Sequence, residues 1–291
     1  MKKKYIKIKK NITITFVTFH SDHLIFKRLD NLKSFKTVVV ENSLKTKLKK
    51  KIEQKYKLAK VIVPKKNLGY GGGNNLSFTK IKTDYCLIMN PDAYLNKKDL
   101  NILLAYIYNL PEFGILFPRF DTNKSLDYFK NCKNSFKRVY YDNFLKFSSG
   151  CCMLVNLKML GGKVGFFDEN YFLYNEEQDL VKRCQDKKIK IFLLKDCIVN
   201  HKPNSSHNPN KNLEIEIFKH WHYMWSEFYY LNKHFGYFHA FNKMIGELIK
   251  SFVMSVWTYM TLKRHKSKRY RSRFKGLFNA MLCRASHLRP L

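Results

Sequence analysis

The sequence predicts an α/β fold, with a mixed, mainly parallel sheet flanked by helices and a helical extension at the C-terminus. Short apolar segments alternate with longer amphipathic segments over the first hundred residues, which is the pattern of strands and helices in such a sheet. Several short segments are apolar throughout, as expected of strands covered on both faces. From about Glu214 the chain becomes strongly aromatic with helical spacing. We therefore expect two domains, at residues 1–212 and 213–291.

The predicted strands are runs of β-branched, aliphatic or aromatic residues bounded by turn-forming residues. Residues 11–19, NITITFVTF, show this composition most clearly, and residues 85–89, YCLIM, stop at Asn90-Pro91. The predicted strands are 11–19, 37–40, 61–63, 85–89, 114–117, 149–154, 190–194 and 197–199. Ligands of such sheets bind beyond the carboxyl ends of the strands, and both Glu41 and Asp92 lie there.

The predicted helices carry apolar residues three or four positions apart. In residues 22–35 these include Ile25, Leu29 and Leu32, with Ser21 or Asp22 as the N-cap. The predicted helices before residue 213 are 22–35, 44–56, 74–81, 97–109 and 176–187. Residues 120–147 are less regular and are expected to form an excursion near the ligand site.

The net charge is +33, from 55 Lys and Arg residues against 22 Asp and Glu residues. Such a chain is expected to meet anionic partners: a membrane surface, a nucleic acid or a phosphorylated substrate. A lysine-rich composition bias explains the same charge without any partner, so charge alone selects none of them. The 45% hydrophobic content excludes a disordered chain. Seven cysteines without a C-x-x-C spacing argue against a zinc knuckle and suit a reduced, cytoplasmic chain.

Residues 244–260 place their apolar side chains on one stripe of a helix, with Glu247 and Lys250 outside it. The stripe comprises Met244, Ile245, Leu248, Ile249, Phe252, Val253, Val256, Trp257 and Met260. Residues 263–275 then hold eight Lys or Arg residues and no acid. Two interpretations stay open: a helix lying on an anionic membrane leaflet, or a helix packed on the domain with a solvated basic end.

Two motifs that follow predicted strands suit a phosphate ligand. Residues 67–75 contain four glycines before a predicted helix, and such a segment admits close approach of the backbone while the helix N-terminus offers N–H groups to phosphate. An ordinary strand–helix turn is the alternative. Asn90-Pro91-Asp92 follows the fourth strand, where a carboxylate can hold Mg²⁺ or Mn²⁺ together with substrate phosphate. Taken alone, this motif favours a simple Pro-Asp turn.

Carboxylates are concentrated in one short segment, at Asp168, Glu169, Glu176, Glu177 and Asp179. Concentrated negative charge is costly unless a cation or a catalytic task offsets it. A general base is one such task, whereas the start of a helix accounts for one or two of the acids. His201 ends an apolar strand and is either a metal or phosphate ligand or, as for most single histidines, a structural residue.

In order and spacing, these motifs resemble family 2 glycosyltransferases of the GT-A type, especially their rhamnosyltransferase-like branch. The resemblance covers roughly residues 12–207. The matching motifs are Glu41-Asn42-Ser43, where the family has Asp-Asn-x-Ser, residues 67–75, Asn90-Pro91-Asp92, which stands for the metal-binding D-x-D, Ser149-Gly150, Gly165-Phe166-Phe167-Asp168-Glu169, Glu176-Glu177-Gln178-Asp179-Leu180, and His201 followed by Ser205-Ser206.

The resemblance implies a GT-A fold and an inverting, metal-dependent transfer of a sugar, with rhamnose favoured by the branch. The donor would be a nucleotide diphosphate sugar, dTDP- or UDP-linked with GDP still open, and the acceptor a saccharide or lipid-linked saccharide in surface polysaccharide synthesis. The expected location is the cytoplasm, with peripheral attachment to the inner face of the cell membrane through the basic helices.

The resemblance also implies roles for individual residues. Donor nucleotide binding falls to Glu41, Asn67, Gly69, Gly71, Gly72, Asn75 and Asn90. The divalent cation, Mg²⁺ or Mn²⁺, falls to Asp92 and His201, and the acceptor side to Ser149, Gly150, Asp168 and Glu169. The catalytic set is Glu176, Glu177 and Asp179, in which Glu177 is preferred as the base by register with the family and Asp179 is its competitor.

Two departures from the family pattern bear on activity. Glu41 and Glu177 each stand where the family has Asp, which lengthens the side chain by one methylene. A shift of about 1 Å can cost on the order of 10²-fold in rate, so either the site is adapted to Glu or activity is impaired. A catalytically impaired GT-A scaffold in a glycan assembly complex is therefore an alternative function. A nucleic-acid-binding protein is disfavoured for lack of a motif, and a nucleotidyltransferase because residues 18–21 contain no glycine.

Overall fold

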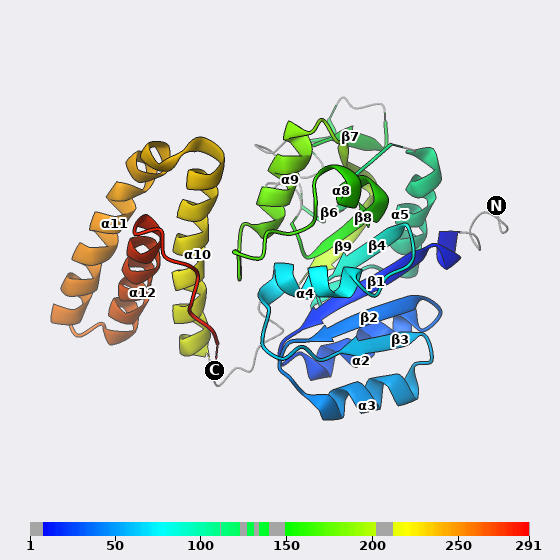
Figure 1. Ribbon diagram of the computed structural model, residues 1–291, viewed down its shortest axis with the longest axis horizontal. Helices are drawn as coiled ribbons and strands as arrows, with labels where there is room; N and C mark the ends of the chain where they lie inside the picture. Colours follow the sequence, from blue (N-terminus) through cyan, green and yellow to red (C-terminus); the bar gives the residue numbers. More distant parts are fainter. Residues whose placement is uncertain are drawn as a thin grey trace. The chain divides into compact units, whose positions relative to one another are not determined.

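The computed structural model describes residues 8–110, 112–122, 127–130, 134–139, 149–201 and 212–290 (Figure 1). The chain forms two compact units. The first unit takes Met1–Leu68, Gly72–Phe167 and Leu180–Ser206, and the second takes Gly69–Gly71, Asp168–Asp179 and His207–Leu291. The domain boundary expected between residues 212 and 213 stays a prediction. Ser205 and Ser206 lie outside the described residues, as do parts of the expected excursion at 120–147.

Within the described residues, a nine-stranded sheet runs through the first unit in the order β3-β2-β1-β4-β8-β6-β9-β5, with β7 also paired to β9. Its strands are β1 (Ile12–Thr18), β2 (Lys36–Glu41), β3 (Ala59–Ile62), β4 (Tyr85–Met89), β5 (Ala93–Tyr94), β6 (Ile115–Phe120), β7 (Phe136–Arg138), β8 (Cys152–Asn156) and β9 (Ile191–His201). Strand β1 pairs in parallel with β2 and β4, whereas β8 lies antiparallel between β4 and β6. The sheet is therefore mixed, as expected.

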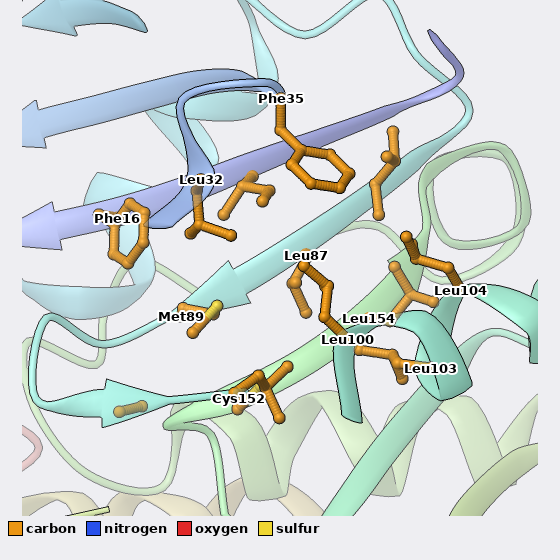
Figure 2. Packing of buried hydrophobic residues seen from close by; sticks show 14 of the residues in the cluster. Phe16, Leu32, Phe35, Leu87, Met89, Leu100, Leu103, Leu104, Cys152 and Leu154 are labelled. Atoms are coloured by element: carbon orange, nitrogen blue, oxygen red, sulfur yellow. The ribbon is translucent and has the colours of Figure 1, made fainter. Parts of the chain in front are cut away.

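Helices pack on both faces of this sheet. They are α2 (Asp22–Leu32), α3 (Thr46–Lys55), α4 (Gly69–Phe78), α5 (Lys97–Asn109), α8 (Leu157–Lys163) and α9 (Glu176–Asp186). Helices α2, α3 and α5 bury apolar residues in one core with Phe16 and Leu87 of the sheet, part of which is drawn in Figure 2. Because successive side chains of a strand point to opposite faces, Val17 faces the other side, where Gly73 of α4 approaches it.

Strand β9 corrects one sequence expectation. The two short strands predicted at 190–194 and 197–199 are one strand, in which the register against β6 shifts between Pro118 and Arg119. The irregularity is held by two buried polar side chains: Arg119 Nε donates to the carbonyl of Lys195 at 2.7 Å, and Asp99 Oδ1 accepts from the amide of Ile198 at 3.0 Å. Polar residues inside β9 therefore mark a bulge and not a turn.

Helix α4 corrects another expectation. It was predicted to begin at Asn74, after a glycine loop, but it begins at Gly69, so the glycines form its first turns. A Cβ atom on Gly73 would lie 2.8 Å from Val17 Cγ1. The glycines therefore allow the helix backbone to lie close to β1. The short elements β5, β7 and α8 were not predicted, because they are too short to show a periodic pattern.

The second unit contains the C-terminal helices α10 (Asn212–Phe235), α11 (Tyr237–Met260) and α12 (Arg264–Met281) (Figure 1). Trp221, Trp225 and Phe228 of α10 form a buried core with Met244 of α11 and Leu277 of α12. Among the described helices, none has the length and apolar character needed to cross a bilayer.

Candidate functional site

The carboxyl ends of β1 and β2 meet at Glu41, which is fully buried. Its carboxylate accepts hydrogen bonds from the Thr18 hydroxyl and, at 2.9 Å, from the amide of Ser43. The neighbouring Asn42 donates its amide N–H to the carbonyl of Thr18 at 2.8 Å. The carboxylate of Glu41, at the end of β2, thus joins this strand to the end of β1 through the hydrogen bond from Thr18. Its predicted contact with a nucleoside stays a prediction.

The glycine segment is held in place by close backbone contacts. Gly69 has a φ of +73°, and its Cβ would lie 2.2 Å from the carbonyl oxygen of Phe172. Gly71 and Gly72 are buried in α4, and Asn67 is half-buried just before it. Asn75 exchanges two hydrogen bonds with the backbone of Phe167, at 2.9 and 3.1 Å. These contacts explain the residue types of the segment structurally, and they leave its predicted role in donor binding untested.

Gly69→Ala is expected to lower the free energy of unfolding by at least about 3 kcal/mol, because it combines a left-handed backbone with a clash against a carbonyl. Urea unfolding measures this. The matched control is Gly246→Ala in α11, where no atom lies within 4 Å of the new Cβ and helix propensity predicts a gain of about 0.5–1 kcal/mol. Equal stability of the two variants would contradict the packing role assigned to Gly69.

Asp92 and His201 lie side by side in the first unit. Ala93 of β5 pairs with His201 at the end of β9, and this pairing brings His201 Nε2 to 3.3 Å from Asp92 Oδ1. The side chain of Asp92 is 6% exposed and that of His201 is 18% exposed. Hydrogen bonding to Asp92, and then to Cys151, raises the pKa of His201 to about 10. The two predicted metal ligands are therefore adjacent although more than a hundred residues separate them.

The carboxylate oxygen of Asp92 suits Mg²⁺ or Mn²⁺, and the imidazole nitrogen of His201 beside it favours the transition-metal ion, Mn²⁺. In the part of the chain that the structure describes, no group of three or more His, Cys, Asp or Glu side chains is arranged for a metal. Two protein ligands agree with a Mg²⁺-type site, which keeps positions for water and substrate phosphate. The cation would have to displace the proton of His201. On this donor set, the residues fit a divalent cation.

The backbone around Asp92 is fixed by neighbouring elements. The backbone N–H of Asn90 donates to the backbone carbonyl of Cys151 at 2.8 Å, which links the end of β4 to the start of β8. Ser149 Oγ accepts from the amide of Cys151 at 3.3 Å, and Gly150 is buried beside it. Of the predicted site residues, Asn90 and Ser149 therefore share one connection through Cys151.

Asp179 is fully buried in the second unit beside two side chains of α10, Lys233 and His234. Its Oδ1 atom lies 2.6 Å from Lys233 Nζ and 2.9 Å from His234 Nε2, and the side chain has no exposed surface. Lys233 also lies 2.7 Å from Asp168 Oδ2, which accepts from the Tyr229 hydroxyl at 3.0 Å as well. Burial opposes the charge on Asp168, but hydrogen bonds from Lys233 and then Asn170 lower its pKa. Lys233 therefore forms salt bridges with both Asp168 and Asp179.

Glu176 and Glu177, at the start of α9, differ in their surroundings. Glu176 is buried, and its Oε2 atom makes no hydrogen bond within the described residues. Burial, and then the charge of Glu177, raise the pKa of Glu176 well above its usual range. Glu177 is only half-buried, and Glu169 is exposed. Among the three predicted catalytic acids, Glu177 is thus the one that is partly exposed.

The sequence analysis missed three basic residues near the predicted acids. Lys233 and His234 were read only as part of an aromatic, basic tail, and no local pattern marks them as partners of an acid. Arg28 of α2 donates from Nε to the carbonyl of Pro91 at 2.9 Å and stacks over Tyr94, with 5.2 Å between its guanidinium and the ring centroid. Burial lowers the pKa of Arg28, although Tyr94 and Asp92 oppose this. Arg28 is therefore a fixed cation next to Asp92.

The sequence model described as glycosyl transferase family 2 matches residues 26–184, more than half of the 291 residues. The chain belongs to glycosyl transferase family 2. The matched region of this family 2 chain includes Glu41, the glycine segment, Asp92 and the acids through Asp179. It ends before His201 and the C-terminal helices.

A curated relative of this family 2 chain is the low-salt glycan biosynthesis hexosyltransferase Agl10 of Haloferax volcanii, which is 25% identical over 148 residues. The match covers 43% of this chain and 46% of Agl10, so it spans about half the length of that relative.

Two solved structures resemble the whole chain. S. aureus TarS 1–349, crystallised with UDP-GlcNAc, has a TM-score of 0.53 and 17% identity. The mannosyltransferase PcManGT of Pyrobaculum calidifontis, in complex with GDP-Man and Mn²⁺, has a TM-score of 0.55 and 10% identity. Each covers 95% of this chain and 93% of its own. At these identities they show the fold, and the GT-A fold with C-terminal helices is confirmed.

Proposed function

We propose that this family 2 chain is an inverting, metal-dependent glycosyltransferase that moves a sugar from a nucleotide diphosphate sugar to a saccharide or lipid-linked acceptor. The observation that carries the proposal is the pairing of Asp92 with His201 at 3.3 Å, in a chain that belongs to this family. The complexes of TarS with UDP-GlcNAc and of PcManGT with GDP-Man and Mn²⁺ support the substrate class and the cation.

In this proposal Asp92 and His201 hold the cation, and Arg28 fixes the backbone at Pro91. A bound divalent cation would neutralise the negative charge of the leaving diphosphate. The tie between the ends of β1 and β2 through Glu41, and the close packing of the glycine segment, give the donor side a rigid backbone. Such preorganisation is what electrostatic catalysis requires, because no reorganisation is then needed during the reaction.

The proposed base, which removes the proton of the acceptor hydroxyl, is Glu177. Asp179 is fully buried and lies 2.6 Å from Lys233 Nζ and 2.9 Å from His234 Nε2, so an acceptor has no access to it. The raised pKa of Glu176 favours its protonated form, which cannot accept a proton. Glu177 is half-exposed, so an acceptor hydroxyl can approach its carboxylate. The exposure of Glu177 therefore favours it as the base, independently of the family register.

The narrower parts of the proposal rest on the sequence motifs. Rhamnose as the sugar, with dTDP as the nucleotide, follows from the likeness to the rhamnosyltransferase-like branch. Attachment to the inner face of the cell membrane follows from the basic C-terminal helices. The hexosyltransferase named Agl10 supports a hexose-type sugar and a role in glycan synthesis.

A panel of nucleotide diphosphates tests the proposal, through thermal unfolding of the full chain with dTDP, UDP and GDP, each with and without Mn²⁺. A ligand present at 100 times its Kd stabilises the native state by roughly 2.7 kcal/mol, which raises Tm by about 4 °C for a chain of this size. We expect one nucleotide to do this only with Mn²⁺. No shift with any nucleotide would favour the impaired scaffold, for which the internal hydrogen bonds of Glu41 are the supporting observation.

A further inference from the structure

The second half of α11 exposes an apolar face. The stripe begins in the core of the second unit, where Met244 is 5% exposed and Leu248 packs against buried neighbours. Beyond Leu248 its side chains are between 45% and 71% exposed, at Ile249, Phe252, Val253, Val256, Trp257 and Met260. Spacings of three and four residues place them on one side of the helix. The first half of the stripe is therefore covered by the second unit, and the second half is exposed.

Cationic side chains border this apolar face. Helix α12 begins at Arg264, four residues after α11 ends at Met260. Trp257 of the apolar face and Tyr270 line a pocket of about 320 Å³ together with Lys263, Lys266, Arg269 and Arg273. We call residues 263–275 the basic block. The apolar face and the basic block form one continuous surface on α11 and α12.

This pocket carries an excess of positive charge. Arg269 Nη2 lies 2.5 Å from Glu216 Oε2, and Arg273 Nη2 lies 3.0 Å from Glu247 Oε2. Lys263 and Lys266 have no such acidic partner in the described part of the chain.

Arg269, Arg273 and His220 also line this pocket. The Nε atoms of Arg269 and Arg273 are buried and make no hydrogen bond to any described residue. Burial, and then the charges of Arg273 and Arg269, lower the pKa of His220, which lines the same pocket. The positive charge of the pocket suits a phosphate group.

We propose that the exposed face of α11 and the basic pocket of α12 dock on an anionic lipid bilayer, with a lipid headgroup phosphate in the pocket. Amphipathic helices with a cationic border bind at the level of the headgroups in this way. The proposal deepens the membrane attachment included in the proposed function, but it does not depend on sugar transfer.

The alternative occupants fit this surface less well. A second copy of the chain, docked by the same face, would oppose two basic blocks, because a two-fold interface repeats the same patch on both sides. A nucleic acid would neutralise the cations but would leave Ile249, Val253 and Met260 in water, since single strands are held by stacking on aromatic side chains. A bilayer alone satisfies both the aliphatic side chains and the positive charge.

Trp257 provides a direct reporter of the contact. The chain has three tryptophans, of which Trp221 and Trp225 are 4% and 3% exposed and Trp257 is 59% exposed. The full chain is mixed with vesicles of phosphatidylcholine, with or without 30% phosphatidylglycerol. We expect sedimentation with the anionic vesicles only, together with quenching of tryptophan fluorescence by brominated lipid. The Trp257→Phe variant should still sediment but should lose the quenching. Equal binding to both vesicles, or unchanged quenching in Trp257→Phe, would overturn the proposal.

Two double variants and their controls test the two parts of the surface. Lys263→Gln with Lys266→Gln should weaken the vesicle partition coefficient about 30-fold, since each basic residue near an anionic surface contributes about fivefold. Lys47→Gln with Lys50→Gln, exposed on α3, is the charge-matched control and should change it less than twofold.

Phe252→Ser with Met260→Ser should weaken vesicle binding at least tenfold, whereas Leu58→Ser, at a residue 46% exposed in the first unit, should not. Thermal melts check that each variant folds. Sedimentation velocity without vesicles measures the oligomeric state and so tests for a second copy on this face. A monomer supports the bilayer, and a dimer that dissociates in the Phe252→Ser, Met260→Ser variant would assign the face to a second copy.

Discussion

Asp92→Asn is expected to lower kcat for sugar transfer by about 10²–10³-fold, the range found when a group that stabilises transition-state charge is removed. Asparagine keeps the shape of the side chain but loses the negative charge that a divalent cation needs. The same variant should lose the Mn²⁺-dependent rise in Tm with nucleotide. The loss of both properties in one variant would connect Asp92 to the cation and not only to the fold.

The control for Asp92→Asn has to separate chemistry from stability, because Asp92 is buried beside His201 and close to Arg28. Removing one member of a buried charged pair destabilises a protein, so urea unfolding without ligands is measured in parallel. Asp121→Asn is the matched control, since Asp121 is 69% exposed and lies 3.7 Å from Arg119. An Asp92→Asn protein that kept normal turnover and normal Mn²⁺-dependent nucleotide binding would remove the metal role.

Glu177→Gln is expected to lower kcat by about 10²–10⁴-fold, the usual contribution of a general base, with little change in the free energy of unfolding. The side chain is half-buried and its substitution by glutamine conserves volume. Because the base acts only in the reaction, donor binding in the thermal-shift assay should persist. Steady-state kinetics with a saturating donor would measure the effect.

Asp179→Asn gives the opposite pattern and serves as the comparison. Its carboxylate is fully buried between Lys233 and His234, so the substitution should lower the free energy of unfolding by about 2–3 kcal/mol. The lower end of the range for buried pairs applies because Lys233 is partly exposed and keeps Asp168 as a partner. If Asp179→Asn were as stable as the parent chain but inactive, Asp179 would replace Glu177 as the base.

Elements with local end signals could be predicted from the sequence to the residue. Helix α5 spans Lys97–Asn109 as predicted, and its start is set by Asn96, whose side chain accepts from the amide of Asp99 at 2.8 Å. Strand β4 spans Tyr85–Met89 as predicted, since Asn90-Pro91 stops it. The helix 74–81 was predicted too late because glycine disfavours a helix locally, whereas close packing against Val17 requires it here.

The candidate site could be predicted from the sequence only as a set of motifs. The position of Asp92 after an apolar strand is local information. The proximity of His201 to Asp92 cannot be read from the local sequence. It depends on the bulge in β9 and on the two-residue strand β5, which pairs Ala93 with His201. In the same way, no pattern near Asp179 indicates that Lys233 and His234, more than fifty residues later, enclose it.

The sequence by itself determined the α/β class, the order of most strands and helices, the family motifs and the positive C-terminal helices. The tertiary structure decided which polar residues meet, which acids are buried, and which half of the α11 stripe is covered. The physical reason is the range of the interactions. Caps, turns and periodicity act between residues a few positions apart, whereas burial and ion pairing depend on which distant segments the fold brings together.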